Sequence, residues 1–183
     1  MDAEPLKSDI EKELQGLDDL IAISRLEAHL KKAKTMAIKR FILLKMIEVY
    51  TKKNMLSEAA RSYDALAQMA ATTQEKVDMH IKEAELYIQA ANYELADRAM
   101  NKAIYTGKER NIIVNAVKDL YFKQGYSLEK AGKPALAAKL YEKMLTMNLP
   151  VHERNLIQEK LVFLYEKVGK LKEHFALKKK LGM

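Results

Sequence analysis

Several lysines recur at a regular interval along the chain and could bind an anionic partner. These ladder lysines are Lys45, Lys82, Lys123 and Lys160, spaced 37, 41 and 37 residues apart. A second, incomplete row consists of Lys52, Lys130 and Lys167. Ammonium groups attract carboxylates and phosphates, so a row of them on one surface would favour an acidic peptide or a nucleic acid.

Aromatic residues accompany the lysines toward the C-terminal end of the chain. Phe122, Tyr126 and Phe163 are expected to reach the same surface and to serve as apolar anchors. The competing interpretation is an ordinary solvated helix face, because Glu48 and Glu85 lie three residues after Lys45 and Lys82. Such pairs support a helix by about 0.2–0.5 kcal/mol each without binding anything.

No catalytic constellation is apparent in the sequence. The four histidines, His29, His80, His152 and His174, fall in different parts of the chain, and there is no cysteine. His80 and Glu83 would share a helix face, but no second pair of ligands supports a metal site. Phosphate-binding glycine loops and the common hydrolase motifs are also missing. The sequence therefore predicts a protein that is not an enzyme and needs no cofactor or metal.

Almost every segment shows helical periodicity and is rich in good helix formers, which predicts an all-α fold. Glycine and proline number only six and three, too few for many short strands and tight turns. The expected helices span residues 5–15, 17–33, 36–53, 56–70, 73–91, 93–106, 109–131, 134–147, 151–168 and 170–181. Capping boxes at Ser8 and Thr72 mark two helix starts, and Gly107, Gly132 and Gly169 are expected to end helices in the left-handed conformation.

Two further sets of residues repeat with the period of the ladder lysines. The first set is Tyr50, Tyr87, Leu128 and Tyr165, spaced 37, 41 and 37. The second is Ala22, Ala59, Ala96 and Ala137, spaced 37, 37 and 41, and each alanine is followed four residues later by Leu26, Tyr63, Met100 or Tyr141. A four-residue insertion must fall between Ala96 and Leu128, near residues 107–115. The pattern predicts stacked helix hairpins, because one hairpin cannot bury its apolar face alone.

These residues resemble the tetratricopeptide repeat, whose pattern is W-x2-L-G-x2-Y, then A-x3-F, then P. The closest copy is Tyr121-x2-Gln124-Gly125-x2-Leu128, followed by Ala137-x3-Tyr141 and Pro150. Because the period exceeds the family's 34, the chain looks more like the divergent long-repeat subgroup that includes the soluble NSF attachment proteins. The last helix departs from the pattern at His174 and Lys178, as expected for a capping helix with a polar outer face.

The resemblance implies a right-handed solenoid of antiparallel helix hairpins in a single domain, 1–183. Its parts would be a shortened leading repeat, 1–34, and four repeats, 35–71, 72–108, 109–149 and 150–183. In this family the first helices line a concave groove that holds an extended peptide or a partner helix. The ladder lysines and the three aromatic residues would then line that groove.

One subgroup of the family binds chaperone tails through a clamp of lysine, asparagine and arginine on successive first helices. In this sequence Leu44, Glu48, Asp78 and Asp119 occupy clamp positions, and only Lys82 and Lys123 match. Chaperone-tail binding is therefore not expected.

The charge distribution completes the functional prediction. The chain has a formal net charge of +7, and residues 108–183, with 16 basic and 8 acidic side chains, supply more than all of it. We expect a cytoplasmic scaffold or adaptor, with no membrane span, that binds an acidic segment of another protein. Two alternatives stay open: RNA binding by the basic repeats, and self-assembly into a homo-oligomer.

Overall fold

The computed structural model describes residues 6–183, and within them every regular element is a helix. The helices are α1 (Lys7–Leu14), α2 (Asp19–Lys32), α3 (Met36–Lys52), α4 (Leu56–Gln68), α5 (Thr73–Gln89), α6 (Tyr93–Thr106), α7 (Arg110–Lys130), α8 (Pro134–Leu145), α9 (Val151–Lys167) and α10 (Leu171–Leu181). The predicted all-α fold is confirmed, and these bounds lie within about two residues of those expected. The first predicted helix begins at residue 5, which lies outside the described residues.

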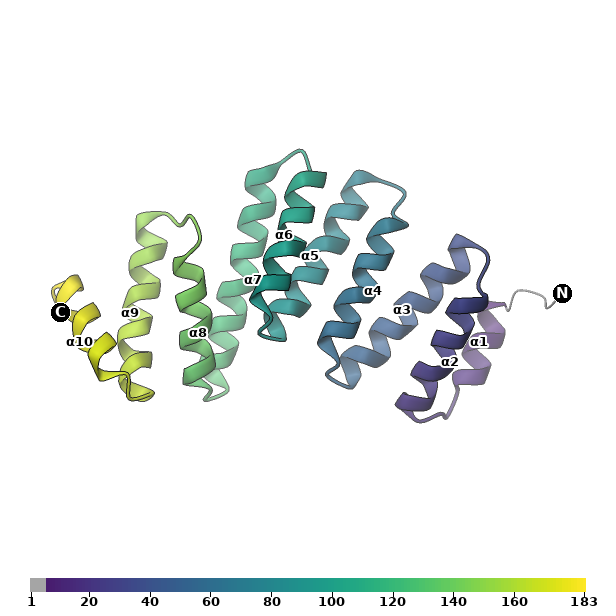
Figure 1. The fold of residues 1–183 in the computed structure, drawn as a ribbon, viewed down its shortest axis with the longest axis horizontal. Coiled ribbons are helices and arrows are strands. Elements are labelled where there is room, and N and C mark those ends of the chain that lie inside the picture. The colour runs from purple at the N-terminus through teal and green to yellow at the C-terminus, as the bar shows by residue number, and fades with distance from the viewer. Residues whose placement is uncertain (1–5) are drawn as a thin grey trace. The chain divides into compact units, whose positions relative to one another are not determined.

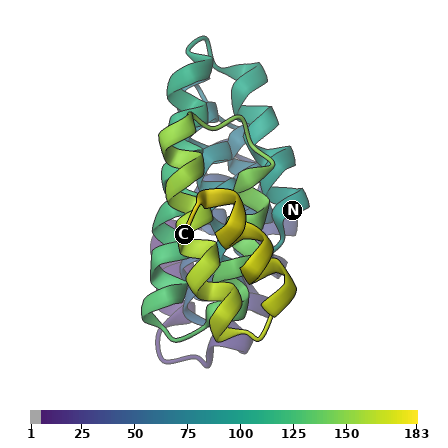
Figure 2. The ribbon, with the colours of Figure 1, turned by 90° about the vertical axis from the view of Figure 1, so that its left-hand side faces the viewer.

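The chain forms two compact units, which we call unit 1 (Met1–Val117) and unit 2 (Lys118–Met183). Unit 1 holds α1 to α6 and the first turns of α7, whereas unit 2 holds the rest of α7 and α8 to α10. Within each unit the helices pack mainly on their neighbours in sequence (Figure 1). In unit 2, α10 lies against α9 (Figure 2). Such sequential packing is consistent with a helical repeat.

The helix starts reproduce the predicted period and locate the insertion. Helices α3, α5 and α7 begin 37 residues apart, whereas α9 begins 41 residues after α7. Helix α7 has 21 residues, while α3, α5 and α9 each have 17. The four inserted residues therefore form one extra turn of α7, because an α-helix has 3.6 residues per turn.

The repeated alanines lie in the interior of the helix packing. Ala22, Ala59, Ala96 and Ala137 are all buried, as predicted. In unit 2 a close approach involves Gly125 of α7, where an added Cβ would lie 2.6 Å from the ring of Tyr141 on α8. Any side chain at residue 125 would displace that buried ring, so glycine is required there by packing rather than by backbone conformation.

A tyrosine on the first helix of a hairpin meets a carboxylate of the preceding helix in both units. In unit 1 the Tyr50 hydroxyl donates to Glu27 at 3.2 Å. In unit 2 the Glu142 carboxylate of α8 lies near the Tyr165 hydroxyl of α9. Burial, and then the nearby carboxylate, raises the pKa of each hydroxyl to about 12. Both hydroxyls therefore stay protonated at neutral pH, and the Tyr50 hydroxyl links α3 to α2 through its bond to Glu27.

Two of the predicted helix signals are wrong. Helix α1 begins at Lys7, and the amides of Asp9 and Ile10 donate to the carbonyl of Leu6, so Ser8 lies inside the first turn and does not cap it. Gly107 has a φ of −84° rather than a positive one. Its Cβ would lie 2.3 Å from Ile113 Cδ1, so glycine is needed there because the chain passes close to that side chain.

The remaining signals are confirmed. The Thr72 hydroxyl accepts from the amide of Glu75 at 3.1 Å and caps α5. Gly132 and Gly169 have positive φ, as helix-terminating glycines do. Pro134 is the first residue of α8, where no amide hydrogen is needed.

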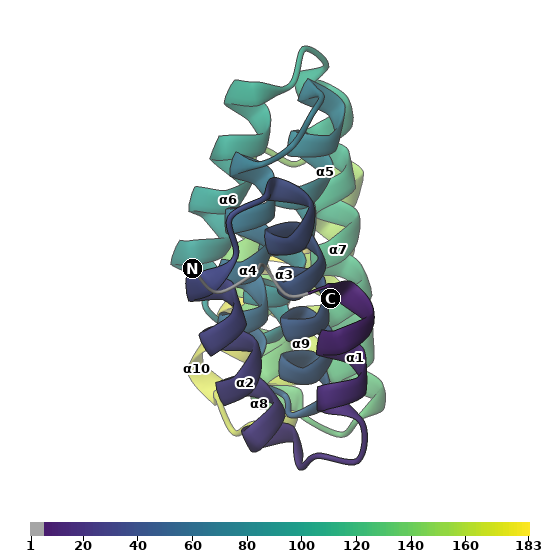
Figure 3. The same ribbon diagram turned by 90° about the vertical axis from the view of Figure 1, so that its right-hand side faces the viewer.

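The terminal helices differ from the simple picture of polar caps. On α10, His174 takes the position of the repeated alanine, is buried, and donates from Nδ1 to the carbonyl of Val162 at 2.9 Å. The exposed side of α10 is mixed, because Leu171 and Phe175 are exposed together with Lys172, Glu173 and Lys178–Lys180, so the expected polar outer face is confirmed only in part. At the other end, α1 lies beside α2 and reaches α3 through an ion pair between Glu11 and Lys45 (Figure 3).

The alanine register predicts a large difference between two substitutions. Ala96 is buried in α6, whereas Ala71 is exposed between α4 and α5. Ala96→Glu should lower the free energy of unfolding by about 3 kcal/mol or more, because it overfills the interface and buries a charge. Ala71→Glu should change it by less than about 0.5 kcal/mol. Urea unfolding measures both, and equal losses would contradict the register.

Candidate functional site

The ladder lysines of unit 1 are held by contacts within the protein. Lys45 on α3 forms ion pairs with Glu48 at 3.3 Å and with Glu11 of α1 at 3.6 Å. Lys82 on α5 is exposed, and its ammonium lies over the ring of Tyr63 at 5.6 Å. The Glu48 pair agrees with the solvated-face interpretation of the sequence. Of these two lysines, Lys82 is the one that has no ion pair with any residue that the structure describes.

In unit 2, Lys160 on α9 is also paired within the protein, whereas Lys123 on α7 is exposed. The Lys160 ammonium donates to Glu129 at 2.8 Å, and the same carboxylate accepts from the Tyr141 hydroxyl. Burial alone would raise the pKa of the Glu129 carboxyl, but these two hydrogen bonds outweigh it and hold that pKa below its ordinary value. Lys160 therefore stabilises the α7–α9 packing.

The aromatic anchors predicted from the sequence lie on the first helices of unit 2. Tyr126 is 54% exposed on α7 and Phe163 is 57% exposed on α9, whereas Phe122 is half-buried. The Lys130 ammonium lies 4.6 Å from the centre of the Tyr126 ring. This distance is that of a cation–π contact, which keeps the ring and the charge on one surface.

A hollow of about 370 Å³ brings α7 and α9 together on this side of unit 2. Glu129 lines it from α7, and α9 contributes the apolar Leu156, Phe163 and Leu164, the basic Lys160 and Lys167, and the exposed carboxylate of Glu159. Leu156 is 48% exposed and lies seven residues before Phe163, hence on the same side of the helix. We define the α7–α9 face as Lys123, Tyr126 and Lys130 of α7 with Leu156, Phe163 and Lys167 of α9.

The positive charge of the chain belongs to unit 2. Residues 118–183 carry 14 basic and 7 acidic side chains, a net charge of +7, whereas residues 1–117 carry 18 of each. Lys118 and Lys160 are neutralised by Glu153 and Glu129. Lys123, Lys130 and Lys167 of the α7–α9 face have no ion pair with any described residue, so their ammonium groups can meet an anionic partner.

Unit 1 contains a partly buried charge network, of which the sequence analysis identified His80 and Glu83 but not the other two members, Asp64 and Lys102. His80 Nδ1 donates to Glu83 at 2.9 Å and lies 3.8 Å from Asp64 of α4. The ligand atoms of these three residues lie within 4.8 Å of one another, as metal ligands would. However, the Lys102 ammonium of α6 donates to Asp64 at 2.8 Å and to Glu83 at 3.0 Å. A cation of the protein itself therefore balances this cluster.

Some residues of these sites were missed by the sequence interpretation, although a signal existed for two of them. Leu156 could have been found as the apolar residue two helical turns before Phe163. Asp64 lies 23 residues before Tyr87, as Glu27 lies before Tyr50 and Glu142 before Tyr165. Glu129 carried no comparable signal, because its partners come from two other helices.

Comparison with known proteins gives no assignment. No family model, no curated protein and no solved structure matches this chain. Among the helices of residues 6–183, none is long and apolar enough to cross a membrane.

The Glu129 network predicts a pH-dependent contribution to stability. The folded state lowers the pKa of the Glu129 carboxyl below its ordinary value of 4.5. The ionised carboxylate therefore adds to the free energy of unfolding at pH values above 4.5, and this stabilisation is lost as the pH falls through the folded-state pKa. Glu129→Gln should therefore destabilise the protein by about 1–3 kcal/mol at neutral pH. This difference from the wild type should shrink as the pH falls below 4.5. Urea unfolding across this range measures it, and a difference that does not vary with pH would contradict the assignment.

Proposed function

We propose that the chain is a non-catalytic interaction scaffold of the tetratricopeptide type, a right-handed solenoid whose unit 2 binds an acidic segment of another protein. The α7–α9 face is the proposed binding surface. The observation that carries the proposal is the hollow that brings exposed Leu156 and Phe163 of α9 together with Lys167, which has no ion pair with any described residue. On α7, exposed Tyr126 lies under the ammonium of Lys130, which is likewise without a described ion pair.

The chemistry of the face suits an amphipathic acidic segment. Exposed aromatic side chains provide anchors that lose little conformational entropy when they are covered. The flanking ammonium groups attract carboxylates and orient the partner during encounter. Because Glu129 is already occupied by Lys160 and Tyr141, it repels an acidic partner less than a free carboxylate would.

RNA binding is less well supported by the same face. The lysines would also attract phosphates, but recognition of single-stranded RNA uses a regular set of stacking and base-reading residues. Of the three predicted aromatic anchors, two are exposed and they come from different helices. The acidic protein segment is therefore the preferred partner.

Selection of short random peptides displayed on phage tests the proposal without assuming a partner. Peptides enriched on the wild-type protein should be acidic and contain apolar residues, and their binding should weaken as salt is added. Lys123→Glu with Lys167→Glu should weaken binding by more than about tenfold at low salt, since two facing charges are reversed. Phe163→Ser should weaken it with no change in charge.

The control reverses the same number of charges elsewhere in unit 2. Lys178→Glu with Lys180→Glu lies on the exposed side of α10 and makes an equal change in net charge. Equal losses for the two pairs, or enrichment of basic peptides, would overturn the proposal. Lys160 is avoided as a test because its substitution would break the Glu129 network and alter stability. A single-stranded RNA that competes fully with the selected peptides would favour the alternative.

A further inference from the structure

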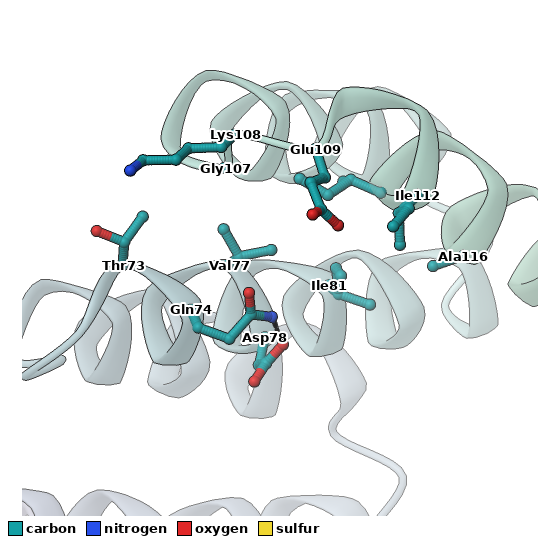
Figure 4. A pocket seen from close by; sticks show the side chains of 11 residues that line it. Thr73, Gln74, Val77, Asp78, Ile81, Gly107, Lys108, Glu109, Ile112 and Ala116 are labelled. Carbon is teal, nitrogen blue, oxygen red and sulfur yellow. Dashed lines mark hydrogen bonds between the residues drawn. The ribbon is translucent and has the colours of Figure 1, made fainter.

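A second cavity lies wholly within unit 1, at the start of the helix that carries the extra turn. It has a volume of about 480 Å³ and is bordered by the first half of α5 and by residues 107–116 (Figure 4). This volume is within the range of small-ligand sites. We call it the α5–α7 pocket. None of its lining residues belongs to the α7–α9 face.

The floor of the pocket is apolar. Val77 and Ile81 of α5 face Ile112 of α7 across it (Figure 4). Val77 also belongs to a small buried cluster with Ala103 and Ile113, which fixes the floor in place. Ile112 is 62% exposed, although a β-branched side chain of this size is usually covered. A bound alkyl chain would cover it.

Two of the three charged side chains that line the pocket are carboxylates, Asp78 and Glu109, and the third is Lys108. The Glu109 carboxylate points into the space above Val77 and Ile81 and has no hydrogen bond or ion pair with any described residue (Figure 4). Asp78 on α5 supplies a second carboxylate, which accepts from the side-chain amide of Gln74 at 2.8 Å and has no ion pair with residues 6–183. Lys108 extends away from the apolar side chains (Figure 4). The pocket therefore attracts positive charge.

We infer that the α5–α7 pocket binds an alkylammonium group, with its methylenes on Val77, Ile81 and Ile112 and its charge at Glu109. Such a group occurs in the lysine side chain of a partner and in a free aliphatic amine. An apolar stem that carries one terminal cation matches an apolar floor beside an unpaired carboxylate. This ligand is opposite in charge to the one proposed for unit 2, so the two inferences stand or fall separately.

Titration with small amines, followed by NMR of isotope-labelled isoleucine methyl groups, tests this inference. At constant ionic strength, hexylammonium should shift the methyl signals of Ile81, Ile112 and Ile113 and leave those of Ile10 and Ile157 unchanged. Each buried methylene is expected to strengthen binding by about fourfold, so methylammonium should bind at least ~50-fold more weakly. Hexanoate, which has the same length and the opposite charge, should not bind.

Matched variants separate charge from general effects. Glu109→Gln should weaken hexylammonium binding by about fivefold or more, and Ile112→Ser by a similar factor. Glu94→Gln is the control, because Glu94 is an exposed carboxylate at the start of α6, as Glu109 is at the start of α7. Circular dichroism checks that all three variants keep the wild-type melting temperature.

Further ligands identify the source of the group. Tighter binding of Nα-acetyl-lysine amide, whose side-chain ammonium is free, than of hexylammonium would point to a lysine side chain of a partner protein. Tighter binding of diaminohexane would point to a free polyamine whose second charge reaches Asp78. The inference would be overturned if hexanoate bound as tightly as hexylammonium. It would also be overturned if Glu109→Gln and Glu94→Gln had equal effects, or if the signals of the three isoleucine methyl groups did not shift.

Discussion

The close approach of helices at small residues is the constraint on which the rest of the structure depends. Buried Ala59 and Ala96 in unit 1, and Ala137 in unit 2, leave no room for a larger side chain, and Gly125 lies against the ring of Tyr141. Because the small residue must lie at the same position along the helix axis in each hairpin, neighbouring helices keep a fixed register. That register turns one side of the first helices toward solvent, where Lys82, Lys123 and Phe163 are exposed.

The two units use these free helix sides differently. Unit 2 carries the whole net positive charge and exposes aromatic residues between lysines. Unit 1 carries no net charge, and several of its lysines, such as Lys45 and Lys102, form ion pairs within the protein. Glu109, a carboxylate with no ion pair to any described residue, lies beside an apolar hollow. One helical architecture can thus present two surfaces of opposite charge preference without any change in its backbone plan.

The fold was predictable because helix periodicity and the repeated alanines are local or regularly spaced signals. The helix bounds, the extra turn of α7 and the burial of Ala96 all follow from them. The candidate sites were predictable only in part. Spacing could place Lys160 on a first helix, but its partner Glu129 depends on how that helix is rotated against α7. The same limit concealed Asp64 beside His80, and the α5–α7 pocket, which depends on the path of the chain at Gly107.

The central claim is that the α7–α9 face, rather than the basic charge of unit 2 as a whole, recognises an acidic segment. Hydrogen exchange measured with and without a selected acidic peptide tests it most directly, because protection reports which helices the ligand covers and stabilises. The account predicts added protection in residues 123–130 and 156–167 and none in α10, although α10 carries three successive lysines, Lys178, Lys179 and Lys180. Protection concentrated in α10, or spread evenly over unit 2, would contradict the account.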